Sequence, residues 1–335
     1  MQIILNDCEK LYDYMKFKTL HCDNVTKASD NMSLEKKIVI LGNFDGIHLG
    51  HQKLFEEAKK RAKETNYKTM IYTFYEYPGK LNNRITTLSE KVDFFDEINI
   101  DYLYLDDFYD VKDMSPLEFL KDILIDKLNV VEIFCGFNYT FGKNKSGNVD
   151  ILKEIISTKL DNKIIVSVID PVMDDENKVI SSTRIREYML DTNLHKAKEL
   201  LGHNPIILGE VIHGKKIGRE LGFPTANLKF ENKVYPGYGT YGVYVHVEGD
   251  EKIYNGVMNI GVNPTLKEGE LSVEVHILDF NEDIYGKVIK VEILEKISDE
   301  VKFTNVNDLI TKINNDVEIW RKRIDEKYGD TSKNR

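Results

Sequence analysis

Two histidines that follow a glycine-bearing turn are the residues of this chain best suited to phosphate chemistry. The run Gly42-Asn43-Phe44-Asp45-Gly46-Ile47-His48-Leu49-Gly50-His51 comes directly after an apolar run and opens a helical pattern. Turn glycines let the backbone approach a ligand closely, and a helix start offers free amide groups and a dipole that favours negative charge. His48 and His51 are three residues apart, so they share a helix face and could donate hydrogen bonds to a phosphoryl oxygen. The alternative is a pair of polar residues at an exposed helix start.

A second polar segment, Ile180-Ser181-Ser182-Thr183-Arg184-Ile185-Arg186, begins another helical pattern after the last apolar run of the first half. The hydroxyls of Ser182 and Thr183 could cap this helix and also bind a phosphate. Arg186 lies three residues after Thr183, on the same helix face, and its planar guanidinium suits a polyphosphate. The alternative is an ordinary Ser/Thr cap with arginines that face solvent.

A glycine-rich basic run occupies the start of the second half, from Gly214 through Gly218 and Gly222 to Asn227. Its lysines include Lys215, and a mobile basic loop of this kind could fold over phosphates. The run ends in Pro224-Thr225-Ala226-Asn227, a rigid turn in which Thr225 and Asn227 offer the hard oxygen ligands that Mg²⁺ accepts. The alternative for the glycine-rich part is a flexible basic surface loop.

One carboxylate lies on the polar face of an alternating strand, Ser272-Val273-Glu274-Val275-His276-Ile277. The valines and Ile277 face the core, so Glu274 and its polar neighbours face the other way. A carboxylate in this position could accept a proton from an attacking hydroxyl. The alternative is an exposed glutamate on a solvated strand.

The elements that must position the first two motifs alternate between strand and helix. A parallel sheet with helices on both faces follows from this alternation, and such sheets bind ligands at the carboxyl ends of their strands. The third helix starts with the capping box Ser115-Pro116-Leu117-Glu118. The predicted strands are Lys37–Leu41, Thr69–Phe74, Tyr102–Leu105, Val130–Cys135 and Ile164–Ile169, and the predicted helices are His51–Thr65, Leu88–Ile98, Pro116–Leu128 and Val149–Thr158.

The second half is instead a series of short β-rich segments separated by turn residues. Together with a final helical pattern from about Val306 to Glu326, which carries the single tryptophan, they predict a small antiparallel barrel or sandwich closed by a helix. The predicted strands are Ile206–His213, Tyr241–Val247, Ile253–Ile260, Leu271–Phe280 and Lys287–Leu294. A helix at Asn193–Leu201, ended by Gly202, marks the seam, so the predicted domains are 1–202 and 203–335.

Size and charge narrow the class of protein. The 335 residues exceed the usual single-domain range, and a formal net charge of −10 argues against general nucleic-acid binding while permitting a small anionic ligand in a local basic pocket. No apolar run is long enough for a membrane span, and Asn6, Asp7 and Glu9 lie where a signal peptide needs apolar residues, which predicts a cytoplasmic location. Three scattered cysteines form no metal or disulfide pattern. Cys135 is expected to be buried and inert, the alternative being a reactive thiol.

Taken together, the motifs of the first half resemble the nucleotidyltransferase superfamily. The similarity is closer still to the adenylyltransferase module of prokaryotic bifunctional riboflavin kinase/FAD synthetases, which Gly42 to Gln52, Gly136-Phe137-Asn138-Tyr139-Thr140-Phe141-Gly142-Lys143 and Ile180 to Arg186 all resemble. The resemblance implies attack of the FMN phosphate on the α-phosphorus of ATP, giving FAD and pyrophosphate. It implies that His48 and His51 steady the phosphates and that Ser182, Thr183 and Arg186 grip the triphosphate. The further nucleotide contacts that it implies are Gly42, Phe44, Asp45, Gly46 and Asn138.

One segment departs from that family pattern. Many members carry Thr-Phe-acid-Pro-His-Pro at the end of the second strand, whereas this chain has Thr73-Phe74-Tyr75-Glu76-Tyr77-Pro78. The segment lies near the nucleotide and flavin in the family, so the departure bears on FMN adenylylation rather than on ATP binding. Tyr75 and Tyr77 could stack on a flavin ring, or they could be ordinary aromatic residues at a strand end.

The motifs of the second half resemble the riboflavin kinase module of the same family. They are the Gly214–Gly222 loop, Phe223-Pro224-Thr225-Ala226-Asn227, Asn259-Ile260-Gly261-Val262-Asn263-Pro264-Thr265 and the strand with Glu274. The resemblance implies a six-stranded antiparallel barrel in which Thr225 and Asn227 hold Mg²⁺ and ATP phosphate. It also implies that Glu274 is the base on the riboflavin 5′-hydroxyl. Gly214, Lys215, Gly218, Gly222, Pro224 and Asn259 would contact the nucleotide.

The whole chain is therefore predicted to make FMN and then FAD from riboflavin, with ATP and Mg²⁺ and without nucleic-acid or membrane partners. Three alternatives stay open at this point. The chain could be a riboflavin kinase whose first half only binds nucleotide, a non-catalytic flavin or nucleotide sensor, or a different adenylyltransferase such as one acting on pantetheine phosphate. The residues carry no signal of the oligomeric state.

Overall fold

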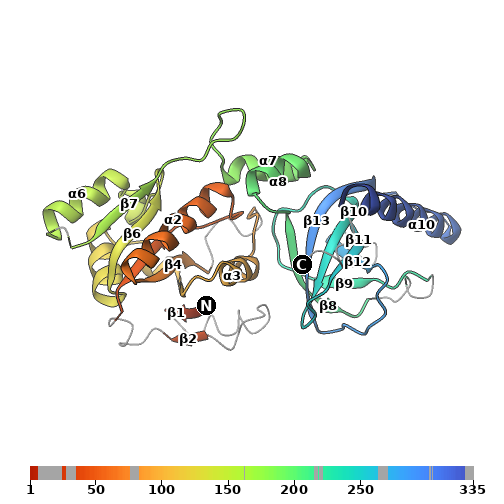
Figure 1. Cartoon of the computed structure of the whole chain (residues 1–335), viewed down its shortest axis with the longest axis horizontal. Helices are drawn as coiled ribbons and strands as arrows, with labels where there is room; N and C mark the ends of the chain where they lie inside the picture. The colour runs from red at the N-terminus through yellow and green to blue at the C-terminus, as the bar shows by residue number, and fades with distance from the viewer. Residues whose placement is uncertain are drawn as a thin grey trace. The chain divides into compact units, whose positions relative to one another are not determined.

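The structure is a computed structural model, shown in Figure 1. It describes residues 1–6, 25–27, 35–75, 83–161, 163–214, 218, 222–262, 271–301, 303 and 305–328. Packing divides the chain into two compact units, Met1–Ser182 and Thr183–Arg335.

The first unit is built on a seven-stranded sheet in which every pairing is parallel, in the order β2-β1-β5-β4-β3-β6-β7. The five predicted strands are present, and β1 and β2 extend the sheet beyond them. These two were missed because three or four residues show too little periodicity. The strands are β1 (Gln2–Leu5), β2 (Val25–Lys27), β3 (Lys37–Leu41), β4 (Lys68–Phe74), β5 (Tyr102–Asp106), β6 (Val130–Gly136) and β7 (Ile165–Ile169).

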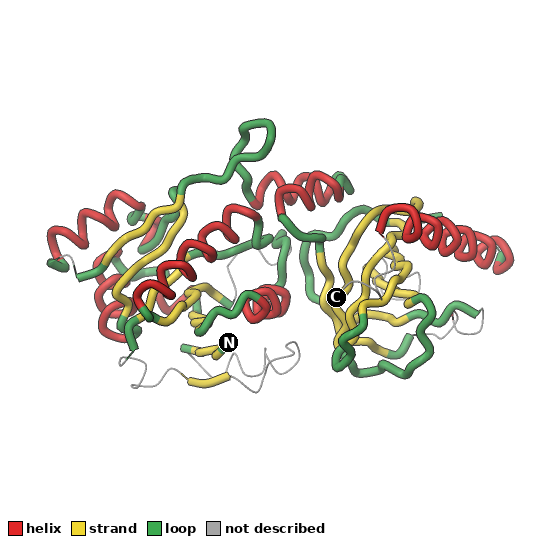
Figure 2. Tube along the Cα trace, viewed as in Figure 1, coloured by secondary structure: helices red, strands yellow, loops and turns green. Residues whose placement is uncertain are grey.

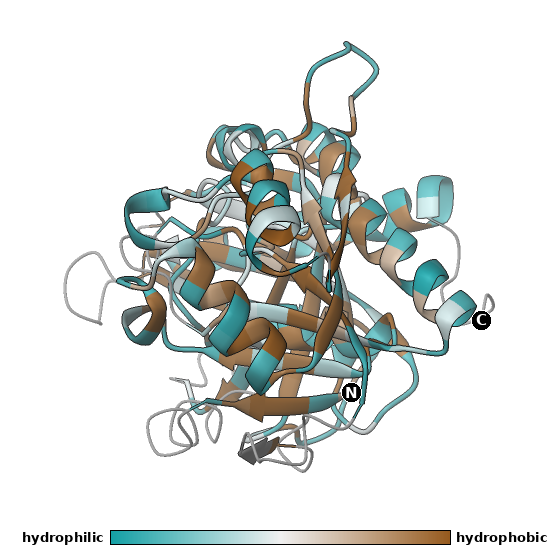
Figure 3. Cartoon of the chain, turned by 90° about the vertical axis from the view of Figure 1, so that its left-hand side faces the viewer, coloured by the Kyte–Doolittle hydropathy of each residue, from teal (hydrophilic) through white to brown (hydrophobic). Residues whose placement is uncertain are grey.

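Helices cover both faces of this sheet, as predicted for a doubly wound fold (Figure 2). One apolar cluster joins the strands to α2 and α3, and a second joins the opposite face to η3 and α6. Figure 3 shows hydrophobic strands inside and hydrophilic residues on the outer helix surfaces. The helices of the first unit are α2 (Leu49–Thr65), α3 (Leu88–Glu97), α4 (Phe108–Val111), α5 (Pro116–Glu118), η3 (Phe119–Lys127), η4 (Lys143–Lys145) and α6 (Val149–Lys159). The next two helices, α7 (Ser182–Leu190) and α8 (Leu194–Leu201), fall in the second unit apart from Ser182.

The helix predicted at Pro116–Leu128 forms with the expected capping box, but it changes character after one turn. Ser115 accepts from the Glu118 amide and Glu118 accepts from the Ser115 amide, which fixes the start. From Phe119 onward the chain continues as a π-helix, η3. Phe119, Leu120 and Leu124 are all buried there, so packing against the sheet outweighs the ordinary helical repeat.

The second unit is a closed antiparallel barrel with strand order β10-β11-β12-β9-β8-β13, which confirms the predicted six-stranded barrel. The short strand β9 escaped the sequence pattern because it has only four residues. The elements are β8 (Ile206–Ile212), β9 (Ala226–Lys229), β10 (Gly239–Val247), β11 (Ile253–Val262), β12 (Leu271–Ile277), β13 (Val288–Asp299), α10 (Val306–Arg323) and η5 (Ile324–Tyr328).

The closing helix α10 is fastened to the barrel by Trp320. The indole is fully buried and packs with Val257, Leu278 and Leu294. A Cβ at Gly242 would lie 2.3 Å from a Trp320 ring carbon, so only glycine leaves room for the ring at this position of β10. The predicted packing of a closing helix on the barrel therefore depends on Trp320, whose ring occupies the space left by Gly242.

The division between the units falls earlier than the predicted boundary after Gly202. Helix α8 packs against β13, and the Gly237 amide donates to the Thr192 hydroxyl at 2.8 Å. These contacts group the residues after Ser182 with the barrel, a preference that local sequence patterns do not reveal.

Candidate active sites

The turn after β3 has an unusual backbone. Phe44, Gly46 and Ile47 all have positive φ angles, of 52°, 85° and 43°. Such angles are strained for bulky side chains and persist only where the surroundings enforce them, often at functional sites. Gly42 is required next to this turn because a Cβ there would lie 2.7 Å from the Phe44 ring.

Phe44 serves the core rather than facing a ligand. Its side chain is 1% exposed and packs against Phe55 and Phe95, with ring centroids 5.1 and 6.0 Å away. Its edge also meets the His51 ring at 5.4 Å. The Phe44 ring therefore packs in the core and also contacts the His51 ring.

Asp45 ties the turn to the segment before α3. Its carboxylate accepts from the backbone amides of Ile85 and Thr86, at 2.7 and 3.2 Å. The Thr86 hydroxyl in turn accepts from the Gly46 amide at 3.0 Å. The buried Asp45 carboxylate is engaged in holding the loop, and a nucleotide contact by this turn stays a prediction.

The two histidines lie against each other at the start of α2. Their rings stack with centroids 3.6 Å apart and planes 18° from parallel. His48 precedes the helix as its N-cap, in an extended conformation and without a side-chain capping bond. His48 is only 8% exposed, which contradicts the alternative of two solvated residues at a helix start.

Both imidazoles are neutral at pH 7. Burial lowers the pKa of His48 to about 4, an effect that the nearby Asp45 carboxylate partly opposes. Burial lowers the pKa of His51 well below its usual range, and the neighbouring His48 and Lys91 lower it further. Among the described residues, neither histidine has a hydrogen-bond partner for its buried Nδ1 atom. Unpaired buried polar atoms are expensive and therefore mark a site that a ligand can complete.

Lys91 brings positive charge to this site. Its ammonium donates to the Asn43 carbonyl at 2.5 Å, and the side chain is 7% exposed. Lys91 cannot be recognised as a site residue from the sequence alone, because its contact with the turn spans 48 residues. The sequence does contain one signal for the start of α3, the capping box of Thr87 and Glu90. Lys91 follows it in the first turn of α3, where it contacts the turn after β3.

The start of α7 reaches the same turn. The Ser182 hydroxyl donates to the Asp45 carbonyl at 2.7 Å, so it binds the turn directly. Thr183 and Arg186 follow on α7, in the residues that pack with the second unit. Their approach to the triphosphate stays a prediction.

Asn138 follows β6 at the carboxyl end of the sheet. Strands β3 and β6 are parallel neighbours with Leu41 opposite Cys135, so the turns that follow them emerge at the same edge. Asn138 is exposed at this edge. Its side chain folds back over β6, because a Cβ added at Gly136 would lie 3.5 Å from the Asn138 Oδ1 atom. Cys135 is buried, as expected, and burial raises the pKa of its thiol to about 11, which disfavours the alternative of a reactive thiol.

The segment that departs from the family pattern is described up to Tyr75. The Tyr75 hydroxyl donates to the Asp107 carboxylate at 2.6 Å, and the ring packs against the apolar cluster under α2 and α3. This placement favours an ordinary aromatic residue at a strand end over a stacking platform for a flavin. Glu76, Tyr77 and Pro78 lie outside the described residues.

In the barrel, three strands bring polar side chains into one row. Glu274 on β12 lies opposite Asn227 on β9 and opposite Asn259 on β11. Directly paired residues of neighbouring strands share a face of the sheet. The Thr225 hydroxyl donates to the Glu274 carboxylate at 3.2 Å, so Glu274 is not the solvated strand glutamate of the alternative reading.

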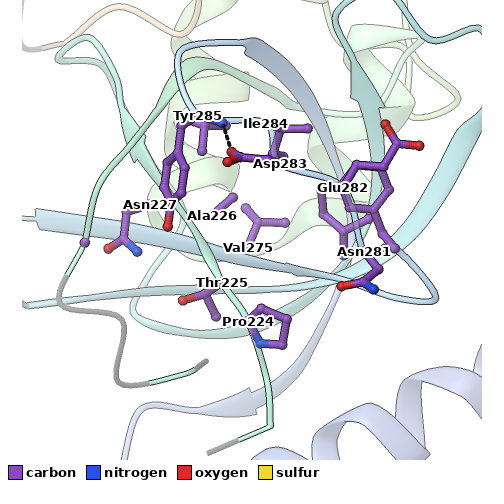
Figure 4. A pocket seen from close by; sticks show the side chains of 14 residues that line it. Pro224, Thr225, Ala226, Asn227, Val275, Asn281, Glu282, Asp283, Ile284 and Tyr285 are labelled. Atoms are coloured by element: carbon purple, nitrogen blue, oxygen red, sulfur yellow. Dashed lines mark hydrogen bonds between the residues drawn. The ribbon is translucent and has the colours of Figure 1, made fainter. Parts of the chain in front are cut away.

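A pocket of roughly 400 Å³ opens beside this row (Figure 4). Its polar lining includes Thr225 and Asn227, and a Cβ at Gly214 would come within 2.4 Å of the Asn227 amide nitrogen. Only a glycine at 214 therefore leaves Asn227 in place. The apolar part of the lining comprises Val211, Pro224, Ala226, Val275, Ile277, Phe280 and Ile284.

The loop after β12 completes the pocket, and no sequence motif marks it. Asn281, Glu282, Asp283 and Tyr285 all line it, and the Asp283 carboxylate accepts from the Tyr285 amide at 3.1 Å. The loop carries no motif of its own. The only available signal was its position directly after the strand that bears Glu274.

The glycine-rich loop is described only in part. Gly218 accepts from the Phe223 amide at 2.8 Å, and Gly222 is exposed with a φ of 89° that suits glycine. Lys215 and the run 263–265 lie outside the described residues. In the described part of the chain, no cluster of three or more His, Cys, Asp or Glu could hold a metal ion by itself.

Both halves match models of known families. A riboflavin kinase family model matches residues 201–324, and an FAD synthetase family model matches residues 30–184. The bifunctional riboflavin kinase/FMN adenylyltransferase of Bacillus subtilis is 36% identical over 293 residues, covering 84% of this chain and 90% of that protein. The protein of the same name from Buchnera aphidicola is 36% identical over 309 residues, covering 89% and 96%.

The fold is shared with a solved structure of similar length. A crystal structure from Streptococcus pneumoniae, titled a macrolide-efflux protein, superposes with a TM-score of 0.73 at 34% identity and covers 86% of this chain and 94% of that one. Within the described ranges of the present chain, no helix has the length and apolarity needed to cross a membrane. Because the sequence relatives extend through both units, the chain belongs to the bifunctional riboflavin kinase/FMN adenylyltransferase family.

Proposed function

We propose that this chain phosphorylates riboflavin to FMN in the barrel and adenylylates FMN to FAD in the parallel-sheet unit. Family membership supports the two activities. The observation that carries the assignment of the first reaction is the hydrogen bond from the Thr225 hydroxyl to the Glu274 carboxylate, because Thr225 itself lines the pocket. ATP as the phosphate donor fits the predicted cytoplasmic location.

In the kinase reaction, Glu274 accepts the proton of the riboflavin 5′-hydroxyl as its oxygen attacks the γ-phosphorus of ATP, and ADP leaves. Thr225 and Asn227 offer neutral oxygens next to the single carboxylate, Thr225 by a hydrogen bond to Glu274 and Asn227 from the directly paired position of β9. This donor set fits Mg²⁺ that arrives with ATP, because phosphate oxygens and water must supply the other ligands. Bound Mg²⁺ would neutralise charge on the transferring phosphoryl group. The apolar lining around Val275 and Ile277 suits the adenine ring.

In the adenylyl transfer, an FMN phosphate oxygen attacks the α-phosphorus of ATP and pyrophosphate leaves. His48 and His51 are neutral, so each carries one ring proton that it can donate to a phosphoryl oxygen. The start of α2 adds backbone amides and its dipole, and Ser182 holds the turn in place. Such chemistry needs positioning and charge stabilisation, and it needs no covalent nucleophile.

The test is to incubate the protein with riboflavin and MgATP and to separate the flavins by chromatography. FMN should form first and FAD should follow. Absence of FMN would refute the kinase assignment, and FMN without FAD would favour the kinase-only alternative that the departure at Tyr75–Tyr77 raised. A variant with both His48→Ala and His51→Ala should lose FAD formation while FMN formation persists, which separates the two sites.

A further inference from the structure

Strand β12 carries the proposed kinase base, Glu274, and a second side chain of this strand, His276, contacts the residues just before β9. Strands β9 and β12 pair only at Asn227–Glu274 and Ala226–Val275. Pro224 precedes Ala226 by two residues and has no backbone N–H, so it cannot donate a hydrogen bond that would continue this pairing. Some other contact must fix the residues just before β9.

His276 makes that contact. Its Nδ1 atom lies 2.8 Å from the Pro224 carbonyl oxygen, and the Phe223 ring meets the imidazole edge-on at 5.7 Å. His276 lies two residues after Glu274, on the same face of β12. Since a carbonyl can only accept, Nδ1 must carry the proton and donate to Pro224.

The peptide held in this way leads directly into the site. Thr225 is the next residue after Pro224, and its hydroxyl donates to the Glu274 carboxylate. On the other side, the Phe223 amide donates to the Gly218 carbonyl at 2.8 Å. Pro224 and Thr225 both line the pocket. A shift of the Pro224 carbonyl would therefore move the Thr225 hydroxyl relative to Glu274.

The geometry points to His276 as a positioning residue for phosphoryl transfer, which sets the place of Thr225 beside the base through its bond to the Pro224 carbonyl. This inference rests on the proposed kinase function of the barrel. It assigns His276 no contact with substrate. Its effect should therefore appear in the use of MgATP, through Thr225, and not in the binding of riboflavin.

Two substitutions separate the hydrogen bond from the bulk of the ring. His276→Leu removes the donor, whereas His276→Asn keeps an N–H donor near the position of Nδ1. His195→Leu is the matched control, because His195 lies exposed on α8 in the same unit, where its Nε2 atom pairs with Glu199 at 3.1 Å. FAD formation from supplied FMN serves as the internal control for folding, since it uses the other unit of the same chain.

For His276→Leu we expect kcat/KM for MgATP in FMN formation to fall about 10-fold, with the KM for riboflavin unchanged. His276→Asn should recover most of that loss, and His195→Leu should match the wild type. Unchanged kinase kinetics in His276→Leu, or an equal loss in the Leu and Asn variants, would overturn the inference. A wild-type chain without kinase activity would instead overturn the proposed function.

A second measurement tests the bond without any turnover. In protein labelled with ¹⁵N-histidine, the His276 ring should show the Nδ1–H tautomer, assigned by its loss in His276→Asn. Observation of the Nε2–H tautomer would overturn the inference even if a variant failed to fold, because Nδ1 could not then donate to Pro224.

Discussion

The buried histidine pair makes the stability of the first unit depend on pH in a way that can be calculated. The pKa of His48 is lowered from 6.5 to about 4, chiefly by burial. His48 therefore takes up a proton near pH 6.5 in the unfolded chain but only near pH 4 in the folded chain. Stability is fully present above pH 6.5 and is lost as the pH falls from 6.5 to 4.

The size of the effect follows from the two pKa values. Each pH unit between them removes about 1.4 kcal/mol, so His48 alone should destabilise the first unit by about 2 kcal/mol when the pH falls from 7 to 5. The lowered pKa of His51 acts in the same direction. A His48→Gln variant keeps a neutral polar side chain and removes the His48 contribution.

Hydrogen exchange of the β3 amides measures this loss, because β3 is fully buried and its amides exchange when the unit opens. After correction for intrinsic rates, wild-type protection should fall between pH 7 and pH 5 by about 20-fold more than protection in His48→Gln. An equal fall in both proteins, or an NMR titration that places the pKa of His48 near 6.5, would refute the claim that burial keeps His48 neutral.

Three other predictions use different parts of the chain. Glu274→Gln should lower FMN formation by about 100-fold or more while FAD formation from supplied FMN is unchanged, and a loss of only a few-fold by chromatography would contradict its role as base. Gly242→Ala should destabilise the barrel by about 1–3 kcal/mol, because the new Cβ would overlap the Trp320 ring; urea unfolding followed by fluorescence of this single tryptophan tests it, with an unchanged midpoint as the contrary result. Lys91→Met should raise the pKa of His51, since it removes a nearby positive charge, and an NMR titration that shows no upward shift would contradict the placement of Lys91.

The sequence reveals those parts of the site that depend on local patterns. The turn before His48 is recognisable because a buried strand, glycines and a helix start follow one another within a few residues. Glu274 is likewise placed on a polar strand face by alternation, and Thr225 and Asn227 are recognisable as oxygen ligands two residues apart after a proline. Both architectures follow from the same periodicities.

What the sequence could not reveal depends on contacts between distant residues. Phe44 and Asp45 belong to a phosphate motif by position, yet the Phe44 ring packs in the core and the Asp45 carboxylate binds amides 40 and 41 residues away. Lys91 and the pocket loop around Tyr285 carry no motif and reach their sites only through tertiary packing. The four-residue strand β9 is too short to show a period of its own, and it is defined by its pairing with β8 and β12.

The most direct test of the account follows the phosphorus atoms of ATP into the flavins. The wild-type chain is incubated with riboflavin and MgATP that carries ³²P at either the γ- or the α-position, and FMN and FAD are separated and counted. The account predicts γ-label in both FMN and FAD and α-label in FAD alone. An unlabelled FMN with γ-labelled ATP, or an FAD fraction without α-label, would contradict the claim that one chain attacks two different phosphorus atoms at two sites.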